Sequence, residues 1–558
     1  MHRPLATALL VLLGLPLLWA LTSAVAAAFD VSAWRAVAAD SQTLPSLAMT
    51  VWTGVASSVL AVGITAWVLS RSFAHSGWSR LTRALGPMLA VPHAAFAIGL
   101  VALLSPSGWL LRLMSPWATG FTSPPPWLTT QDPWGLGLIA VLVFKEVPFL
   151  LWAAATQLQR PDVAGRQARE WLLARSMGYS RPRAWWLVLW PQLWPRLRWP
   201  MLAVLAYGLT VVDVALVIGP TSPPTLAVLA WHWLLDADVA RNTQGAAAAW
   251  LLALLLAVVA GLLWQLPKWP VWRRRWTSGY RGLVNSCGRR NDSARDRPSI
   301  ARLAFSAAYI AVALALAVGS VSGVWAFPAL VPQIFTWGAW VSVADSLGTV
   351  GTTLTLALAS SLAAVLWSVA WLECAPPLWD AWVRRVIYLP IILPSIVWVL
   401  GVYSVALHWG IDATWAGLWL AHTLATLPYV LITLSPAYMG FDARYWHVVA
   451  SLGHGRWAFL ARVKWPLLRS ALASACAVGF AVSVAQYLPT LFIGAGRFST
   501  VTTEAVTRAS GAQRSLTSAY AALQILLPLI GFGLAAWLGQ ARKFATRLHA
   551  MPTRPTLR

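Results

Sequence analysis

Three ionisable side chains stand inside long apolar stretches of the sequence, where a charge is costly. Lys145 and Glu146 interrupt the apolar run 134–156, and Asp213 interrupts the run 199–219. Ionisable residues inside a membrane usually face a cavity, a solute path or one another. Neighbours along a helix do not face each other, so Lys145 and Glu146 each need a separate partner. The lone carboxylate of Asp213 favours a path for a cationic solute.

The equivalent apolar run near the other end of the chain carries Gln486 and Tyr487. We therefore group five candidate residues of a solute path, which are Asp213, Lys145, Glu146, Gln486 and Tyr487. Hydrogen bonding between packed helices is an equally good explanation for polar residues in such positions. The residue types alone leave both interpretations open.

The sequence carries no motif for catalysis, metal binding or nucleotide binding. Its nine histidines show neither HxxxH nor HExxH spacing, its three cysteines form no CxxC pair, and no Gly-x-Ser-x-Gly occurs. A phosphate loop of the GxxxxGK[S/T] type needs a lysine after a glycine, and no lysine here follows one. We expect no catalytic residue, no metal and no cofactor in this chain, so any ATP must be used by a separate subunit.

A polar, arginine-bearing segment occurs twice without a gap. Residues 169–193 read REWLLARSMGYSRPRAWWLVLWPQL and residues 444–468 read RYWHVVASLGHGRWAFLARVKWPLL, with nine of 25 positions identical at a shift of 275. In both copies a glycine stands 13 residues before a proline. The candidate docking residues are Arg169, Ala174, Gly178, Arg181, Val188 and Pro191 in the first copy and Arg444, Gly453, Arg456, Val463 and Pro466 in the second.

Backbone preferences predict the shape of each copy. A short helix leads to a sharp turn at Gly178 or Gly453, because glycine tolerates a positive φ. A second helical stretch leads to Pro191 or Pro466 at the start of the next apolar run, where a missing N–H is harmless. The prediction is a helix–turn–helix along the membrane surface. A lipid anchor is the alternative, but a docking surface for a partner protein better explains the fixed glycine and proline positions.

The composition is that of a membrane protein. The 558 residues are 59% hydrophobic and 10% charged, whereas soluble domains carry about 25% charged residues. Apolar runs long enough to cross a bilayer recur along the whole chain. We predict twelve spans, at 5–28, 46–70, 84–104, 134–156, 199–219, 243–266, 303–326, 347–372, 386–406, 414–437, 470–493 and 515–538.

Basic residues set the predicted orientation. With the N-terminus in the cytoplasm, the inner segments hold 34 Lys and Arg residues and the outer loops hold 6. This asymmetry is typical of the positive-inside rule and places both termini in the cytoplasm. Because topology explains the net charge of +24, we expect membrane lipid but no nucleic acid as a partner.

The twelve predicted spans divide into two similar halves. Residues 1–266 form a first six-helix repeat, residues 267–302 a basic cytoplasmic linker, and residues 303–558 a second six-helix repeat. Pro92 and Gly99 in the first half match Pro394 and Gly401 in the second, with the same spacing of seven. The predicted fold class is an all-α polytopic membrane protein built as a parallel repeat.

The duplicated segment resembles the "EAA" loop of permeases of binding-protein-dependent ABC importers. That pattern reads Glu-Ala-Ala, three residues, Gly, nine residues, Ile or Val, one residue, Leu and Pro. Matches occur at Ala174, Gly178, Val188 and Pro191, and at Gly453, Val463 and Pro466. The chain departs from the pattern at the Glu position, which holds Leu172 and His447, and at the Leu position, which holds Trp190 and Trp465.

The resemblance implies the channel subunit of an ATP-driven importer in the bacterial inner membrane. Two fused permease halves are similar to the iron(III), thiamine and polyamine types. The implied partners are two copies of a cytoplasmic ATPase, docked by the two loops, and a periplasmic solute-binding protein. The main alternative is an ion-coupled secondary transporter, which also uses two six-span halves. A membrane scaffold without transport is a third reading, but it gives no reason for paired loops.

Overall fold

The computed structural model describes residues 2–540 apart from 74–77, 266–299 and 512. Most of these residues are helical, and one isolated bridge joins Ser322 and Phe335. Ten described helices are long and apolar enough to cross a membrane, or eleven if the bent pair Pro377–Ile392 and Ser395–His408 is one span, against the twelve predicted. The all-α polytopic fold class is thereby confirmed. The predicted linker 267–302 lies almost wholly outside the described residues, and the boundaries of the two repeats stay a prediction.

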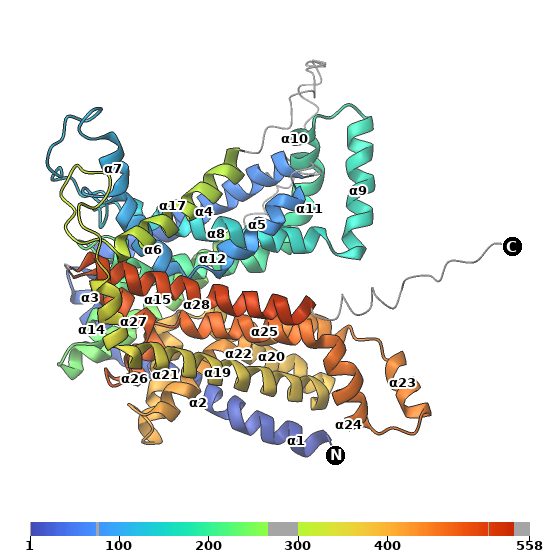
Figure 1. The fold of residues 1–558 in the computed structure, drawn as a ribbon. Coiled ribbons are helices and arrows are strands. Elements are labelled where there is room, and N and C mark those ends of the chain that lie inside the picture. The colour runs from blue at the N-terminus through green and yellow to red at the C-terminus, as the bar shows by residue number, and fades with distance from the viewer. Residues whose placement is uncertain (1, 74–77, 266–299, 512, 541–558) are drawn as a thin grey trace.

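The helices fall into two series along the chain (Figure 1). The first series is α1 (His2–Leu9), α2 (Leu15–Ala26), α3 (Val31–Ala39), α4 (Thr43–Ser72), α5 (Trp78–Ala90), α6 (His93–Leu104), α7 (Trp109–Met114), α8 (Leu136–Leu158), α9 (Pro161–Ser176), α10 (Arg181–Ala184), α11 (Trp190–Leu193), α12 (Arg198–Thr210), α13 (Asp213–Ile218), α14 (Leu226–Leu234) and α15 (Val239–Gln265). The second is α17 (Ile300–Ser320), α18 (Gly338–Asp345), α19 (Leu347–Cys374), α20 (Pro377–Ile392), α21 (Ser395–His408), α22 (Trp415–Met439), α23 (Arg444–Ser451), α24 (Arg456–Phe459), α25 (Trp465–Val484), α26 (Leu488–Gly494), α27 (Val501–Ala509) and α28 (Arg514–Gln540).

Four of the predicted spans are not single helices: 199–219 and 470–493 are each divided near the middle, and 84–104 and 386–406 each break before a proline. The predicted span 199–219 is divided into α12 and α13, and a 3₁₀ turn around Pro195 separates α12 from α11. The equivalent position in the second half holds Ser470, and there α25 runs unbroken for 20 residues. Proline explains the difference, because it removes a backbone donor and clashes with the preceding turn.

The predicted span 386–406 is bent rather than straight. Helices α20 and α21 meet at Leu393 and Pro394 with an angle of 114° between them. In the first half α5 and α6 are separated at the matching residues, Val91 and Pro92. A residue before proline is pushed out of the helical region, which ends the helix at this point in both halves.

The first helix of each half contacts the other half, and α17 also packs along α28 of its own half. Helix α2 lies along α21, and α17 lies along α6. At these crossings two glycines allow close approach: a Cβ on Gly401 would stand 1.9 Å from the Ala20 carbonyl oxygen, and one on Gly99 would stand 2.5 Å from Val312. The paired glycines found in the sequence therefore mark the contacts that join the halves.

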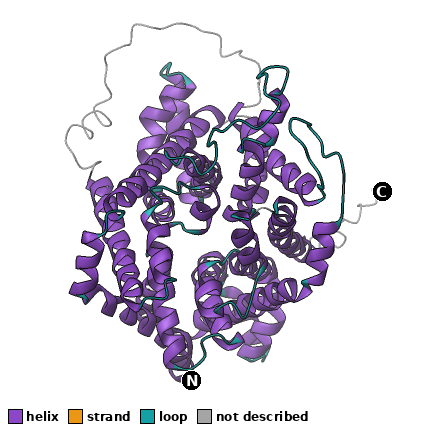
Figure 2. Ribbon diagram, turned by 90° about the vertical axis from the view of Figure 1, so that its left-hand side faces the viewer, coloured by secondary structure: helices purple, strands orange, loops and turns teal. Residues whose placement is uncertain are grey.

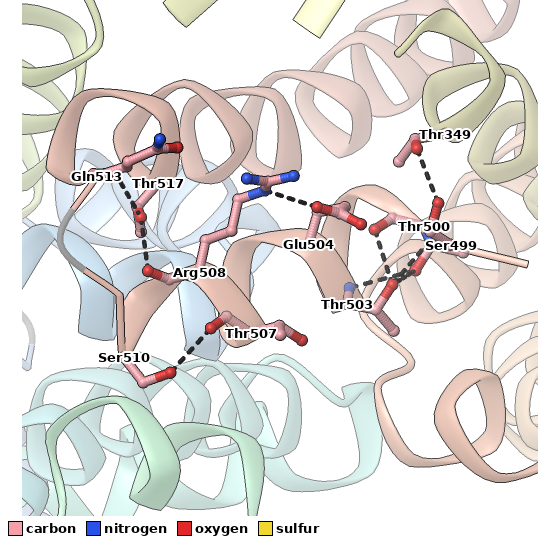
Figure 3. A network of polar contacts seen from close by, with 10 residues as sticks. All are labelled: Thr349, Ser499, Thr500, Thr503, Glu504, Thr507, Arg508, Ser510, Gln513 and Thr517. Atoms are coloured by element: carbon pink, nitrogen blue, oxygen red, sulfur yellow. Dashed lines mark hydrogen bonds and ion pairs between the residues drawn. The ribbon is translucent and has the colours of Figure 1, made fainter. Parts of the chain in front are cut away.

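A threonine contact is also repeated. The Thr50 hydroxyl accepts the backbone N–H of Leu226 at 2.7 Å, and the Thr353 hydroxyl accepts that of Val501 at 2.9 Å. These contacts fix the first residues of α14 and α27, which are equivalent at a shift of 275. Helix α14 is apolar apart from His232, whereas α27 begins with a Thr500–Thr503 capping box and carries the acid–base pair Glu504 and Arg508 (Figure 3).

The two ends of the molecule differ in what they carry. Helices α9 and α23 and the N-terminus lie at one end, and α7, α14 and α27 lie at the other (Figure 1). Figure 2 looks onto the α7 end and shows the helices packed around one another with loops between them. The duplicated segments thus emerge together, at the same end of the helix bundle.

Candidate functional site

The two duplicated loops have the same turn. Gly178 has a φ of 85° and Gly453 a φ of 77°, both in the left-handed region. In each loop the glycine N–H and the following N–H bond back to the preceding helix, the Schellman arrangement that ends helices. The bonds are Gly178 to Arg175 at 3.1 Å, Tyr179 to Ala174 at 3.2 Å, Gly453 to Ala450 at 3.0 Å and His454 to Val449 at 3.2 Å. The predicted sharp turn is therefore present in both copies.

A widened helical turn precedes each proline. Residues Trp185–Leu189 and Leu460–Lys464 form matching π-helical turns, and they contain Val188 and Val463. Pro191 and Pro466 follow two residues later. A proline ring clashes with the carbonyl four residues back in an α-helix, and the wider turn removes that close approach. This explains in physical terms why each proline keeps its place relative to the glycine.

Each loop presents an exposed apolar pair, which the sequence reasoning missed. Leu173 and Met177 lie four residues apart in the first loop, as do Val448 and Leu452 in the second, and all four side chains are between 58% and 74% exposed. Side chains spaced by four share one face of a helix. We call these pairs the apolar faces. The signal was available, because both positions are apolar in both copies.

The first loop is attached to the bundle through aromatic rings. Trp185 is fully buried, and its ring lies 5.4 Å from Phe73 at the end of α4. Trp171 contacts the same phenylalanine at 5.4 Å. Glu170 adds a polar link, because it accepts from Gln192 of α11 and pairs with Arg166 at 2.9 Å. The Gln192 hydrogen bond, followed by that of Arg166, lowers the pKa of Glu170.

The second loop is attached through an ion cluster. The Glu373 carboxylate at the end of α19 pairs with Arg456 at 3.0 Å and with Lys464. It also accepts from the Tyr438 hydroxyl at 2.7 Å, and that hydroxyl accepts from the Trp465 indole at 3.2 Å. Arg456 is therefore one of the residues that attach the second loop to the helix bundle. Arg444 is exposed and pairs with Asp442 at 2.8 Å, and Arg169 is exposed.

Three of the five solute-path candidates gather where the halves meet. Asp213, the first residue of α13, lies within electrostatic range of Tyr487 and of His93. Glu146 contacts the same His93, with 3.4 Å between Nε2 and Oε1. The remaining members are Tyr207, whose ring stands 4.5 Å from that of His93, and Tyr429 of α22, which lies within electrostatic range of Tyr207 and Glu146.

This group, which we call the interface cluster, consists of His93, Glu146, Tyr207, Asp213, Tyr429 and Tyr487. It joins two carboxylates to three tyrosines and one histidine. It lies beside matching helix breaks, at Val211–Val212 between α12 and α13 and at 485–487 between α25 and α26. Discontinuous helices are common at solute sites inside membranes, because their free backbone groups and ends can face a polar space.

Lys145 and Gln486 donate to backbone carbonyls instead. The Lys145 amine donates to the carbonyls of Val91 at 2.6 Å and Met88 at 3.1 Å, at the C-terminal end of α5. A cation there offsets the negative end of the helix dipole. The Gln486 amide, in the break after α25, donates to the Val482 carbonyl of α25 at 3.2 Å. Neither contact could be read from sequence, because each depends on where a helix breaks.

A buried histidine bridges the second helix break. His422 contacts Ser483 of α25 at 2.8 Å and Thr490 of α26 at 2.9 Å, so its two ring nitrogens link the two sides of the break. The equivalent serine and threonine positions in the first half hold Gly208 and Ala215. Within the described residues, no three His, Cys, Asp or Glu side chains could hold a metal ion.

Comparisons with known proteins agree with these features. Residues 374–544 match the family described as "Binding-protein-dependent transport system inner membrane component". The chain is 35% identical to the inner membrane ABC transporter permease protein YnjC of Escherichia coli strain K12, over 95% of each protein. The thiamine transport system permease ThiP of Brucella suis is 29% identical over 26% of this chain and 30% of its own length. This chain belongs to the permease family of ABC transporters.

The family membership bears on two earlier alternatives. It supports a transporter subunit rather than an enzyme, and a multi-pass protein of the inner membrane. It also favours the ABC permease over the ion-coupled secondary transporter and over the scaffold. The resemblance seen in the duplicated loops is confirmed.

Proposed function

We propose that this chain is the membrane channel of an ATP-driven importer whose two loops dock two copies of a cytoplasmic ATPase. The observation that carries the proposal is the pair of apolar faces, presented at one end of the molecule by two loops of the same backbone shape. Two like surfaces fit two copies of one partner. That partner uses the ATP, and a periplasmic binding protein delivers the solute.

The docking role is tested by placing a charge on each apolar face. Met177→Asp and Leu452→Asp should each reduce co-purification of the ATPase and ATP-driven uptake, with the permease still in the membrane. Ser180→Asp and His454→Asp add the same charge beside the turn and serve as controls. Lipid anchoring predicts instead that Arg169→Gln with Arg444→Gln, at exposed arginines outside the two attachments, removes the loops from the membrane while the apolar-face variants keep the ATPase.

The proposal includes an orientation of the chain in the membrane. The basic asymmetry supports a cytoplasmic position for the N-terminus, for residues 267–302 and for the C-terminus. A chain without its native cysteines, with a single cysteine at position 454 or 42, tests it. An impermeant maleimide added to intact cells should label Q42C and not H454C. The reverse pattern would invert the topology.

The solute is proposed to be a small cation that passes the interface cluster. Asp213 and Glu146 supply negative charge, and tyrosine rings attract cations through their faces. The Brucella relatives are named as thiamine permeases, and thiamine carries a quaternary nitrogen, which suits such a site. Asp213→Asn should lower uptake while leaving ATPase co-purification unchanged. Normal uptake by that variant would remove Asp213 from the path.

A further inference from the structure

Two loops from opposite halves form one lobe beside α6 and α17. It consists of residues 105–134, which include α7, and residues 321–337, which follow α17. Figure 1 shows these loops projecting together from the side of the bundle, at the end opposite α9 and α23. We call this structure the α7 lobe. Its function is not explained by the docking loops or by the interface cluster.

Arg112 holds the α7 lobe together. Its guanidinium, 5% exposed, donates to the carbonyls of Ala326 at 2.8 Å, Ala329 at 2.6 Å and Trp325 at 3.1 Å, all in the second loop. It also donates to Ser107 at 2.9 Å and lies 4.6 Å from the centre of the Trp325 ring. The lobe is therefore a built structure that joins the two halves.

The α7 lobe exposes large apolar side chains, and none of its own residues exposes a charge; the exposed Arg514 of α28 donates to the Ser107 hydroxyl at its edge. Trp117, Trp127 and Trp337 are between 54% and 78% exposed. The lobe's ionisable residues are Arg112 and Asp132, and both are buried. Asp132 is engaged by the N–H groups of Leu136 and Gly137 at the start of α8, at 2.8 and 2.9 Å.

Neighbouring segments at the same end are charged, which makes the lobe distinct. Residues 30–42 carry an exposed Arg35, residues 235–241 carry exposed Asp236 and Asp238, and residues 494–514 carry an exposed Arg497. The α27 segment also holds a Glu504–Arg508 ion pair at 2.6 Å (Figure 3). Segments that face water here keep their charges, so the uncharged lobe faces a different surrounding.

We propose that the α7 lobe lies in the phospholipid interface of the leaflet at that end, the outer leaflet in the orientation given above. Tryptophan is enriched at the boundary of headgroups and acyl chains, where its ring suits a partly wet, partly apolar layer. A surface for a transiently binding soluble protein keeps a polar rim and an ordinary share of polar area. The sideways projection brings the lobe to the membrane beside the bundle.

The proposal is tested by measuring membrane depth in the complete chain, reconstituted in phospholipid nanodiscs. Cys287, Cys374 and Cys476 are replaced by serine, and a nitroxide is attached to single cysteines at W117C, W127C or W337C. Collision with oxygen, which concentrates in lipid, is compared with collision with a water-soluble nickel chelate. L60C on the exposed face of α4 is the lipid reference, and Q42C is the water reference.

The lobe positions should show an oxygen-to-nickel ratio several-fold above that of Q42C and close to that of L60C. Arg112→Gln should lower the ratio at W127C and W337C without changing it at L60C, because the two loops would separate. A ratio equal to that of Q42C would overturn the proposal. The proposal would also be overturned if the nickel chelate reached the lobe in the nanodisc and lost access only after the cognate binding protein was added. That result would make the lobe a protein-docking surface. Neither outcome depends on ATPase docking by the other end.

Discussion

The two duplicated loops share a backbone but are attached to the bundle by different forces. Both have a left-handed glycine, a π-helical turn, a proline and an exposed apolar face. The first is attached by buried aromatic rings around Trp185, and the second by the Glu373 ion cluster. The position of Lys464 holds Leu189 in the first loop. The outward shape has been kept while the inward attachment differs, as expected if the outward shape meets the partner.

Truncating the aromatic attachment should have the largest effect. Trp185→Ala removes a fully buried ring, and such changes cost about 3–5 kcal/mol. The equivalent residue in the second loop is Leu460, so Trp185→Leu is a matched variant with a smaller cavity. We expect W185A to lower the melting temperature and ATPase co-purification more than W185L does. Equal losses would mean that the aromatic contacts do not decide the loop's position.

Removing the ionic attachment should have the next largest effect. Glu373→Gln leaves Arg456 and Lys464 without their carboxylate, and hydrogen bonds to charged groups contribute roughly 1.5–3 kcal/mol. The matched control is Ser70→Ala, at the equivalent position of α4. Melting curves at low and high salt distinguish the loops, because screening should weaken the second attachment and leave the first unchanged. Salt sensitivity that persists in E373Q would contradict this assignment.

The turn variants should affect both loops alike. A Cβ on Gly178 or Gly453 would meet nothing within 4 Å, so the cost of Gly→Val is backbone strain alone, about 1–3 kcal/mol. Each variant should uncouple ATP hydrolysis from uptake or release the ATPase. Gly178→Asn and Gly453→Asn are the controls, because asparagine tolerates a positive φ better. If Asn and Val variants behave alike, φ is not the property that matters.

The smallest effect is expected at Glu170. Its folded pKa lies below the unfolded value because of Gln192 and Arg166, so its contribution is present above the unfolded pKa and lost as the pH falls through the folded pKa. Gln192→Leu copies Leu467 of the second loop and should cost at most about 1 kcal/mol at neutral pH. Melting temperatures of wild type and Q192L should converge in acid. A difference in melting temperature that does not change with pH would show that the Glu170 carboxylate does not cause the effect.

Local features of this fold were readable from sequence, and features that depend on distant packing were not. Gly178, Gly453 and the two prolines follow from backbone preferences, so the turn was predicted. The bend before Pro394 was predictable as well, because the residue before a proline is disfavoured in an α-helix. The contacts of α2 with α21 and of α17 with α6, the partners of Lys145 and the approach of Asp213 and Glu146 to the same His93 depend on segments far apart in the chain. Neither the periodicity nor the composition of the sequence indicates which of these segments pack together.

The exchange of the first helices also sets an order of events during synthesis. Helix α6 is made before α17, so α17 meets this partner as soon as it enters the membrane, and it meets its other main partner, α28, at the end of synthesis. Helix α2 ends at Ala26, and its partner α21 begins only at Ser395. At translation rates of about 5–20 residues per second, α2 waits for on the order of tens of seconds with lipid as its main neighbour. Its strongly apolar sequence suits that wait, and the second half completes the first only late in biogenesis.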